Sequence, residues 1–228
     1  MIQQLKKYVM ENDLQNKVIE KFWETFNIWK NDAPEYYSEI FHNILPDDLN
    51  IIISEIDLKS SEWPKCDCTN IIIKILICHA GNELGKYELW FSMSGIDNDD
   101  DFGWSIKPLS FFQQINAPKD NKIAEQLKKY VKENKLHDKA IDCFWIAFNN
   151  WKKDCPKKFV ESFDGVPLDN LNVFVHSIGL RSAQWPECDF NHVHIGILIH
   201  YGDRQLGNYR CFFSLGDDVD DDDILEIY

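Results

Sequence analysis

The strongest constraint on the fold of this chain is that the sequence repeats itself at a shift of 122 residues. The string LKKYV begins at Leu5 and again at Leu127. Residues 5–106 and 127–228 align without a gap and share 42 identities over 102 positions. A repeat of this length has the size of a compact domain, much longer than the unit of a solenoid. The sequence therefore predicts a tandem duplication of one domain.

The alignment divides the chain into three segments. We expect residues 1–106 to form the first copy, 107–126 a connector and 127–228 the second copy. The connector, KPLSFFQQINAPKDNKIAEQ, has no second counterpart and contains two prolines. Three large apolar side chains indicate that it lies against a domain: Leu109, Phe111 and Phe112.

The first part of each copy has the periodicity of helices. In the first copy we expect a short helix over about 3–10 and a longer one over about 14–30, because apolar residues recur there at spacings of three, four and seven. The stripe consists of Leu14, Val18, Ile19, Phe22, Trp23, Phe26 and Trp29, matched by Leu136, Ala140, Ile141, Phe144, Trp145, Phe148 and Trp151. Pro34 and Pro156 should end the long helix. A weaker helical stretch follows over 35–44.

The second part of each copy alternates in the manner of strands. In the first copy the segments 50–58, 70–79 and 86–93 are rich in Ile, Leu, Tyr, Phe and Trp and are bounded by turn residues. The string AGNELG between the last two suits a hairpin. A short final strand is expected at FGWSI, matched by ILEIY at the end of the second copy. The fold class is therefore α+β, each copy having N-terminal helices followed by an antiparallel β-meander of three to four strands.

The charge balance narrows the function. The chain has 24 Lys and Arg against 38 Asp and Glu, a formal net charge of -14 and a pI near 4.8. Such a field repels phosphate, so we expect no nucleic-acid partner, and it attracts cations and basic proteins.

The most visible feature is a run of aspartates at the same place in both copies. Three interpretations remain open: a solvated acidic turn, a weak cation site, or a docking patch for a basic protein. An EF-hand loop does not fit, because the sixth residue counted from Asp97 is Phe102 and the twelfth is Pro108. The aspartates are Asp97, Asp99, Asp100 and Asp101 in the first copy, and Asp217, Asp218, Asp220, Asp221, Asp222 and Asp223 in the second.

A second repeated motif is the loop WPKCD, which starts at Trp63 and recurs as WPECD at Trp185. A Trp-Pro step favours a structural turn, and the functional alternative is that Trp63 and Trp185 are exposed anchors for a partner. A catalytic cysteine in this loop would need a histidine base within reach. No histidine occupies equivalent positions in the two copies.

The sequence gives no sign of a catalytic or metal site. Cys66, Cys68, Cys78 and His79 lie close together, but the second copy has exchanged nearly all of them, and the spacing is not that of paired zinc ligands. GxSxG, HExxH and GxGxxG strings are absent. We therefore expect no metal, no cofactor and no enzymatic activity.

Two features bear on the compartment. The N-terminal residues have no apolar core of a signal peptide, and the longest apolar runs are far shorter than a membrane span. Seven cysteines without framework spacing are typical of reduced thiols. We expect a cytoplasmic protein with no membrane partner.

These observations lead to one functional hypothesis and one alternative. The hypothesis is an acidic protein-binding module, most concretely an immunity-type inhibitor that neutralises a basic, nuclease-like toxin or another cationic protein. Its contacts would come from the aspartates and from Trp63 or Trp185. The alternative is an enzyme or small-ligand-binding protein with a pocket between helices and sheet or between the two copies.

Overall fold

The computed structural model describes most of the chain and divides it into two compact units. The described residues are 1–41, 44–66, 68–93, 103–106, 109–118, 122–163, 166–167, 170–187, 190–215 and 224–227. Unit 1 consists of Met1–Leu58, Asn70–Asn121 and Ser182–Phe190, and unit 2 of Lys59–Thr69, Lys122–Arg181 and Asn191–Tyr228. Each unit thus combines most of one copy with a short segment of the other.

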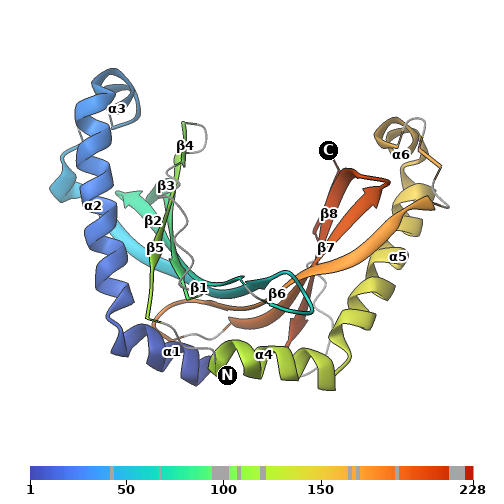
Figure 1. Ribbon diagram of the computed structural model, residues 1–228. Helices are drawn as coiled ribbons and strands as arrows, with labels where there is room; N and C mark the ends of the chain where they lie inside the picture. Colours follow the sequence, from blue (N-terminus) through green and yellow to red (C-terminus); the bar gives the residue numbers. More distant parts are fainter. Residues whose placement is uncertain are drawn as a thin grey trace. The chain divides into compact units, whose positions relative to one another are not determined.

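The described parts of the two aligned segments, which we call the first and second copy, have the same order of helices and strands, apart from the 3-10 turn η1 of the first (Figure 1). The first copy contains α1 (Ile2–Glu11), α2 (Leu14–Asp32), α3 (Pro34–Phe41), the 3-10 turn η1 (Pro46–Asp48), β1 (Asn50–Ser61), β2 (Cys68–His79), β3 (Asn82–Ser92) and β4 (Gly103–Ile106). The second contains α4 (Lys122–Glu133), whose first five residues lie in the expected connector, α5 (Leu136–Asp154), α6 (Pro156–Ser162), β6 (Asn172–Ala183), β7 (Phe190–Tyr201), β8 (Arg204–Ser214) and β9 (Ile224–Ile227). Strand β5 (Leu109–Asn116) lies between them in sequence. The predicted helices and strands are confirmed, with small shifts at their ends.

The fold is α+β. In unit 1 the order of the strands is β4-β5-β3-β2-β1, and in unit 2 it is β6-β7-β8-β9. Strands β2 and β3 pair antiparallel, as do β7 and β8. The first of these hairpins turns at Ala80 and Gly81, whose φ angles are 49° and 82°. Positive φ at both central residues is what a two-residue hairpin turn of type I′ requires.

Strand β5 corrects the prediction for the edge of the first copy. The meander was expected to pass from β3 to the strand at FGWSI, but β5 stands between them, parallel to β3 and antiparallel to β4. Residues 109–116 of the expected connector are therefore part of the sheet. The physical reason is the number of backbone N–H and C=O groups at the edge of β3 that find a hydrogen-bond partner. Strand β5 pairs eight residues with β3, whereas β4 has only four residues. In the second copy β9 pairs directly with β8, antiparallel.

The long helix of each unit packs on one face of its strands (Figure 1). In unit 1 the Phe22 ring meets that of Tyr87 edge to face at 5.7 Å, and in unit 2 Phe144 meets Tyr209 in the same way at 5.6 Å. Burying one such side chain stabilises a fold by about 1.5–3 kcal/mol. The predicted stripe is thus the core.

Burial along the two helix stripes differs at the last tryptophan of each stripe. Both stripes bury their large rings near the middle of the helix, and in both the tryptophan beside them, Trp23 or Trp145, is half-buried. At the C-terminal end, Trp29 is only 4% exposed, whereas the equivalent Trp151 is half-buried. The surroundings of the last tryptophan have therefore diverged between the copies.

The prolines end the long helices as expected and start a short third helix. Pro34 and Pro156 are the first residues of α3 and α6. Proline is tolerated at the first helical position because the amide there has no intrahelical acceptor. The third helix folds back so that Phe41 meets Phe26 at 5.3 Å and Phe163 meets Phe148 at 5.4 Å.

Among the described helices, none combines the length and the hydropathy that crossing a membrane requires.

Candidate functional site

The predicted aspartate clusters lie outside the described residues. In sequence they follow β3, which ends at Ser92, and β8, which ends at Ser214. These two serines are equivalent in the alignment. In sequence, the two clusters therefore follow equivalent strands.

The loop of Trp185 belongs to unit 1, although its sequence belongs to the second copy. The indole is half-buried, and the Lys6 Nζ atom of α1 lies 5.7 Å from the ring centroid, a distance typical of a cation–π contact. Lys6 also donates a hydrogen bond to the carbonyl oxygen of Pro186. Leu5 and Ile56, which are 2% and 1% exposed, line a small gap together with the indole.

The backbone beside Trp185 is fixed as well. The amide of Gln184 donates to the carbonyl oxygen of Ser54 at 3.1 Å, and the Trp185-Pro186 peptide bond is cis. Gln184 has a φ of 59°, which is unusual for a residue with a side chain. The loop is therefore held in unit 1 by backbone and side-chain contacts.

The loop of Trp63 has the converse position, in unit 2. Lys132 Nζ lies 5.9 Å from the indole centroid, and the ring of His137 lies at 5.9 Å. Lys128, the counterpart of Lys6, donates to the carbonyl oxygen of Lys65 at 2.8 Å. The amide of Trp63 donates to the carbonyl oxygen of His176 at 3.0 Å.

The Trp-Pro loops are thus exchanged between the copies, and each contacts basic side chains of the unit it joins. We call residues 62–66 and 184–187 the exchanged loops. Sequence reasoning predicted the motif but missed the exchange, because nothing in a repeated motif shows which copy it contacts. In the helices, the identical pair Lys6 and Lys128 is a sequence feature that agrees with equivalent contacts to both loops.

On the sheet face away from α2, unit 1 carries a charged cluster. Lys74 lies 2.9 Å from a carboxylate oxygen of Glu55 and 3.5 Å from one of Glu88. Glu55 is 7% exposed, so its ion pair is partly shielded from solvent. In the second copy the equivalent residues are Gly196, Ser177 and Arg210. The two copies therefore present different chemistry on this face.

In unit 2 the same face holds a buried imidazole. His194 is 3% exposed, and its ring centroid lies 6.1 Å from that of Phe212. Gly179 on β6 makes room for it, because a Cβ at this position would lie 2.0 Å from His194 Nε2. In the first copy the equivalent residues are Asp57 and Ile72. Glycine and histidine therefore form a matched pair in the second copy.

Besides Tyr37, whose phenol pKa is raised by burial, two described groups have shifted pKa values. Burial raises the pKa of the Tyr87 phenol to about 12, a hydrogen bond with Thr25 partly offsets this, and the charge of Glu24 adds to the rise. Burial also lowers the pKa of His176 from its ordinary value of 6.5, with a further lowering from Lys59 and an opposing effect of Glu62. Both groups stay neutral at pH 7, since burial disfavours their charged forms.

The His176 pKa gives a prediction about pH. Because the folded state binds this proton more weakly than the unfolded state, stability is lost as pH falls through about 6.5 towards the lower folded pKa. His176→Ser, which introduces the residue found at the equivalent Ser54, should reduce the loss of stability between pH 7 and pH 5. Thermal unfolding midpoints across this range measure it. An equal dependence of the midpoint on pH in the two proteins would contradict the prediction. Above about pH 8, where His176 is neutral in both the folded and the unfolded state, the difference in midpoint between the two proteins should no longer change with pH.

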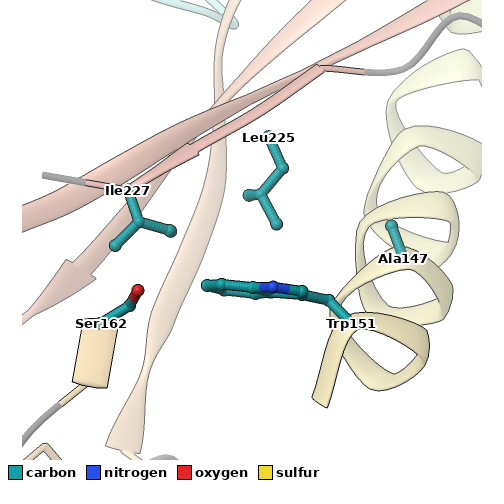
Figure 2. A pocket seen from close by; sticks show the side chains of 5 residues that line it. All are labelled: Ala147, Trp151, Ser162, Leu225 and Ile227. Atoms are coloured by element: carbon teal, nitrogen blue, oxygen red, sulfur yellow. The ribbon is translucent and has the colours of Figure 1, made fainter. Parts of the chain in front are cut away.

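One open pocket lies within unit 2, between α5, α6 and β9 (Figure 2). Its volume is about 430 Å³, and the described residues that line it are Ala147, Trp151, Ser162, Leu225 and Ile227. The sequence analysis gave a pocket between helices and sheet as its alternative, but it named Trp151 only as part of the helix stripe and did not name the other lining residues. The available signals were Ala147 and Ser162, which replace the larger Thr25 and Ile40 of the first copy.

The described residues do not gather three His, Cys, Asp or Glu side chains as a metal site would. Of the cysteines that drew attention in the sequence, Cys68 has its Sγ atom 4.0 Å from a Glu62 carboxylate oxygen. Both residues belong to unit 2, beside the loop of Trp63.

No protein-family model matches the chain, and no curated protein or solved structure matches it.

Proposed function

We propose that this chain is an acidic protein-binding module, most concretely an immunity-type inhibitor that neutralises a basic, nuclease-like toxin in the cytoplasm. The observation that carries the proposal is the net charge of -14, with aspartates concentrated after equivalent strands of both copies. We infer that the chain is a tandem duplication, so that each copy contributes one aspartate cluster. Like charge concentrated in one segment destabilises a fold by self-repulsion, which favours a binding role for it.

The physical basis of the proposed inhibition is electrostatic complementarity. A nuclease needs a cationic groove for the phosphate backbone of its substrate. An anionic protein is drawn to such a groove, which raises the association rate at low salt and blocks substrate entry. Trp63 and Trp185 contact lysines of their own chain. We therefore assign the contacts with the partner mainly to the aspartates.

The first experiment identifies the partner. The tagged full-length chain is used as bait in the native lysate at low salt, eluted with a salt gradient, and its partners are identified by mass spectrometry. A basic protein recovered in stoichiometric amount and released by salt is the expected result. Recovery of no basic protein would count against the proposal.

The second experiment locates the contact. Replacing Asp97, Asp99, Asp100 and Asp101 by asparagine should weaken binding of that basic partner about tenfold, or about 1.4 kcal/mol, and flatten its salt dependence. Isothermal titration at two salt concentrations measures both. The matched control changes the net charge equally, by replacing four exposed acidic residues elsewhere: Glu20, Glu35, Asp47 and Asp48. Equal losses in both variants would show a general charge effect and exclude the aspartate patch.

A further inference from the structure

The pocket of unit 2 plays no part in the proposed binding of a basic protein. We propose that it is a binding site for a small, uncharged molecule with a flat aromatic ring, which stacks on the indole of Trp151. The inference rests on the geometry of this pocket and does not depend on the proposed inhibitor function.

The size and lining of the pocket fit such a ligand. Its volume of about 430 Å³ falls within the roughly 300–1,000 Å³ of small-molecule sites. The described lining residues contribute one indole, three aliphatic side chains and the hydroxyl of Ser162, and polar and apolar atoms share the pocket wall about equally. A flat apolar surface beside polar groups is typical of sites that bind a largely apolar ligand and orient it by hydrogen bonds.

Trp151 provides the flat surface. Figure 2 shows its indole extending from α5 into the pocket, with Leu225 above the ring and Ile227 and Ser162 beyond its far edge. The ring also makes edge-to-face contacts with Phe159 at 5.0 Å and Phe163 at 5.8 Å. A ring fixed in this way loses little conformational freedom when a ligand stacks on it.

The equivalent tryptophan of the first copy is more deeply buried. Trp29 is only 4% exposed, and Thr25, at the position of Ala147, is 7% exposed. Beside β3 the first copy has the eight-residue β5, where the second copy has the four-residue β9 beside β8. The tryptophan is therefore shared by both copies, and its described surroundings differ between them.

The charge of the ligand follows from the lining. None of the described residues that line the pocket is charged, so an ionised group on the ligand would lose hydration without gaining a partner there. The net charge of -14 opposes an anionic ligand further. An uncharged ring avoids both costs.

The test uses the neutral dye N-phenyl-1-naphthylamine, which fluoresces in apolar surroundings, titrated into the full-length protein. We expect saturable binding of one dye per chain. Trp151→Leu, which removes the stacking surface, should weaken binding at least tenfold. Ser162→Tyr, a change at an exposed position that fills the pocket with a ring, should have an effect of the same size. The matched control is Val160→Tyr, on the same helix at a residue that is 66% exposed, and it should bind as the unchanged protein does.

Two results of the dye titration would overturn the proposal. Absence of saturable binding to the unchanged protein overturns the proposal, and so does binding that survives Ser162→Tyr, because the dye would then lie elsewhere. Circular dichroism shows whether each variant is folded, and Ser162→Tyr carries the test if Trp151→Leu is not. None of these measurements involves a protein partner, so their failure leaves the inhibitor proposal standing, and the converse also holds.

Discussion

Replacing Trp185 by alanine is expected to lower the free energy of unfolding by about 2 kcal/mol, less than the roughly 3–5 kcal/mol of a fully buried tryptophan because this ring is half-buried. The loss comes from the contact with Lys6 and from the uncovering of Leu5 and Ile56, which lie beside the indole. Urea unfolding followed by far-UV circular dichroism measures the change.

The control for this substitution lies in the same segment of unit 1. Phe190 is 55% exposed, so Phe190→Ala should change stability by less than about 0.5 kcal/mol. If Trp185→Ala also stayed within this limit, the indole would not be a structural element and would be available as an anchor for a partner. The same comparison with Trp63→Ala tests the loop in unit 2.

The second large effect is expected at Gly179. A methyl group there would lie 2.0 Å from His194 Nε2, and the imidazole is too deeply buried to move aside without disturbing its neighbours. Gly179→Ala should therefore cost about 2 kcal/mol of stability through overpacking. Chemical denaturation of the single variant provides the measurement.

A double-mutant cycle shows whether the clash is the cause. Removing the ring by His194→Ala makes room for the new methyl group, so the combined variant should be more stable than the sum of the two single changes predicts. His200→Ala on the same strand, six residues further on, serves as the control and should add independently. Additivity in both cycles would mean that Gly179 and His194 are not coupled.

Much of the local structure could be predicted from the sequence because it depends on local patterns. The spacing of Leu14, Val18, Phe22 and Phe26 is that of one helix face, and these four side chains are buried. Pro34 and Pro156 mark helix ends by their own chemistry. The hairpin at Ala80 and Gly81 was predicted at its place, with a tighter turn than the string AGNELG suggested.

The features that escaped prediction depend on partners distant in sequence. Residues 109–116 have the composition of a strand, but only the edge of β3 turns them into β5. Trp63 and Trp185 sit in a recognisable motif, yet their contacts are with helices more than sixty residues away. The pocket beside Trp151 depends on residues that surround this ring from α6 and β9, which no local sequence pattern describes. The aspartates lie outside the described residues and stay a prediction.

The exchanged loops also constrain how the two halves of this gene can change. A substitution in the loop of one copy must remain compatible with the helices of the other copy. The residues that constrain Trp63 are therefore Lys132 and His137, and not their counterparts Met10 and Gln15. Changes in the loop of one copy should therefore accompany changes in the helices of the other copy. Recombination that replaced a single copy by a relative would separate each loop from the helix it evolved with.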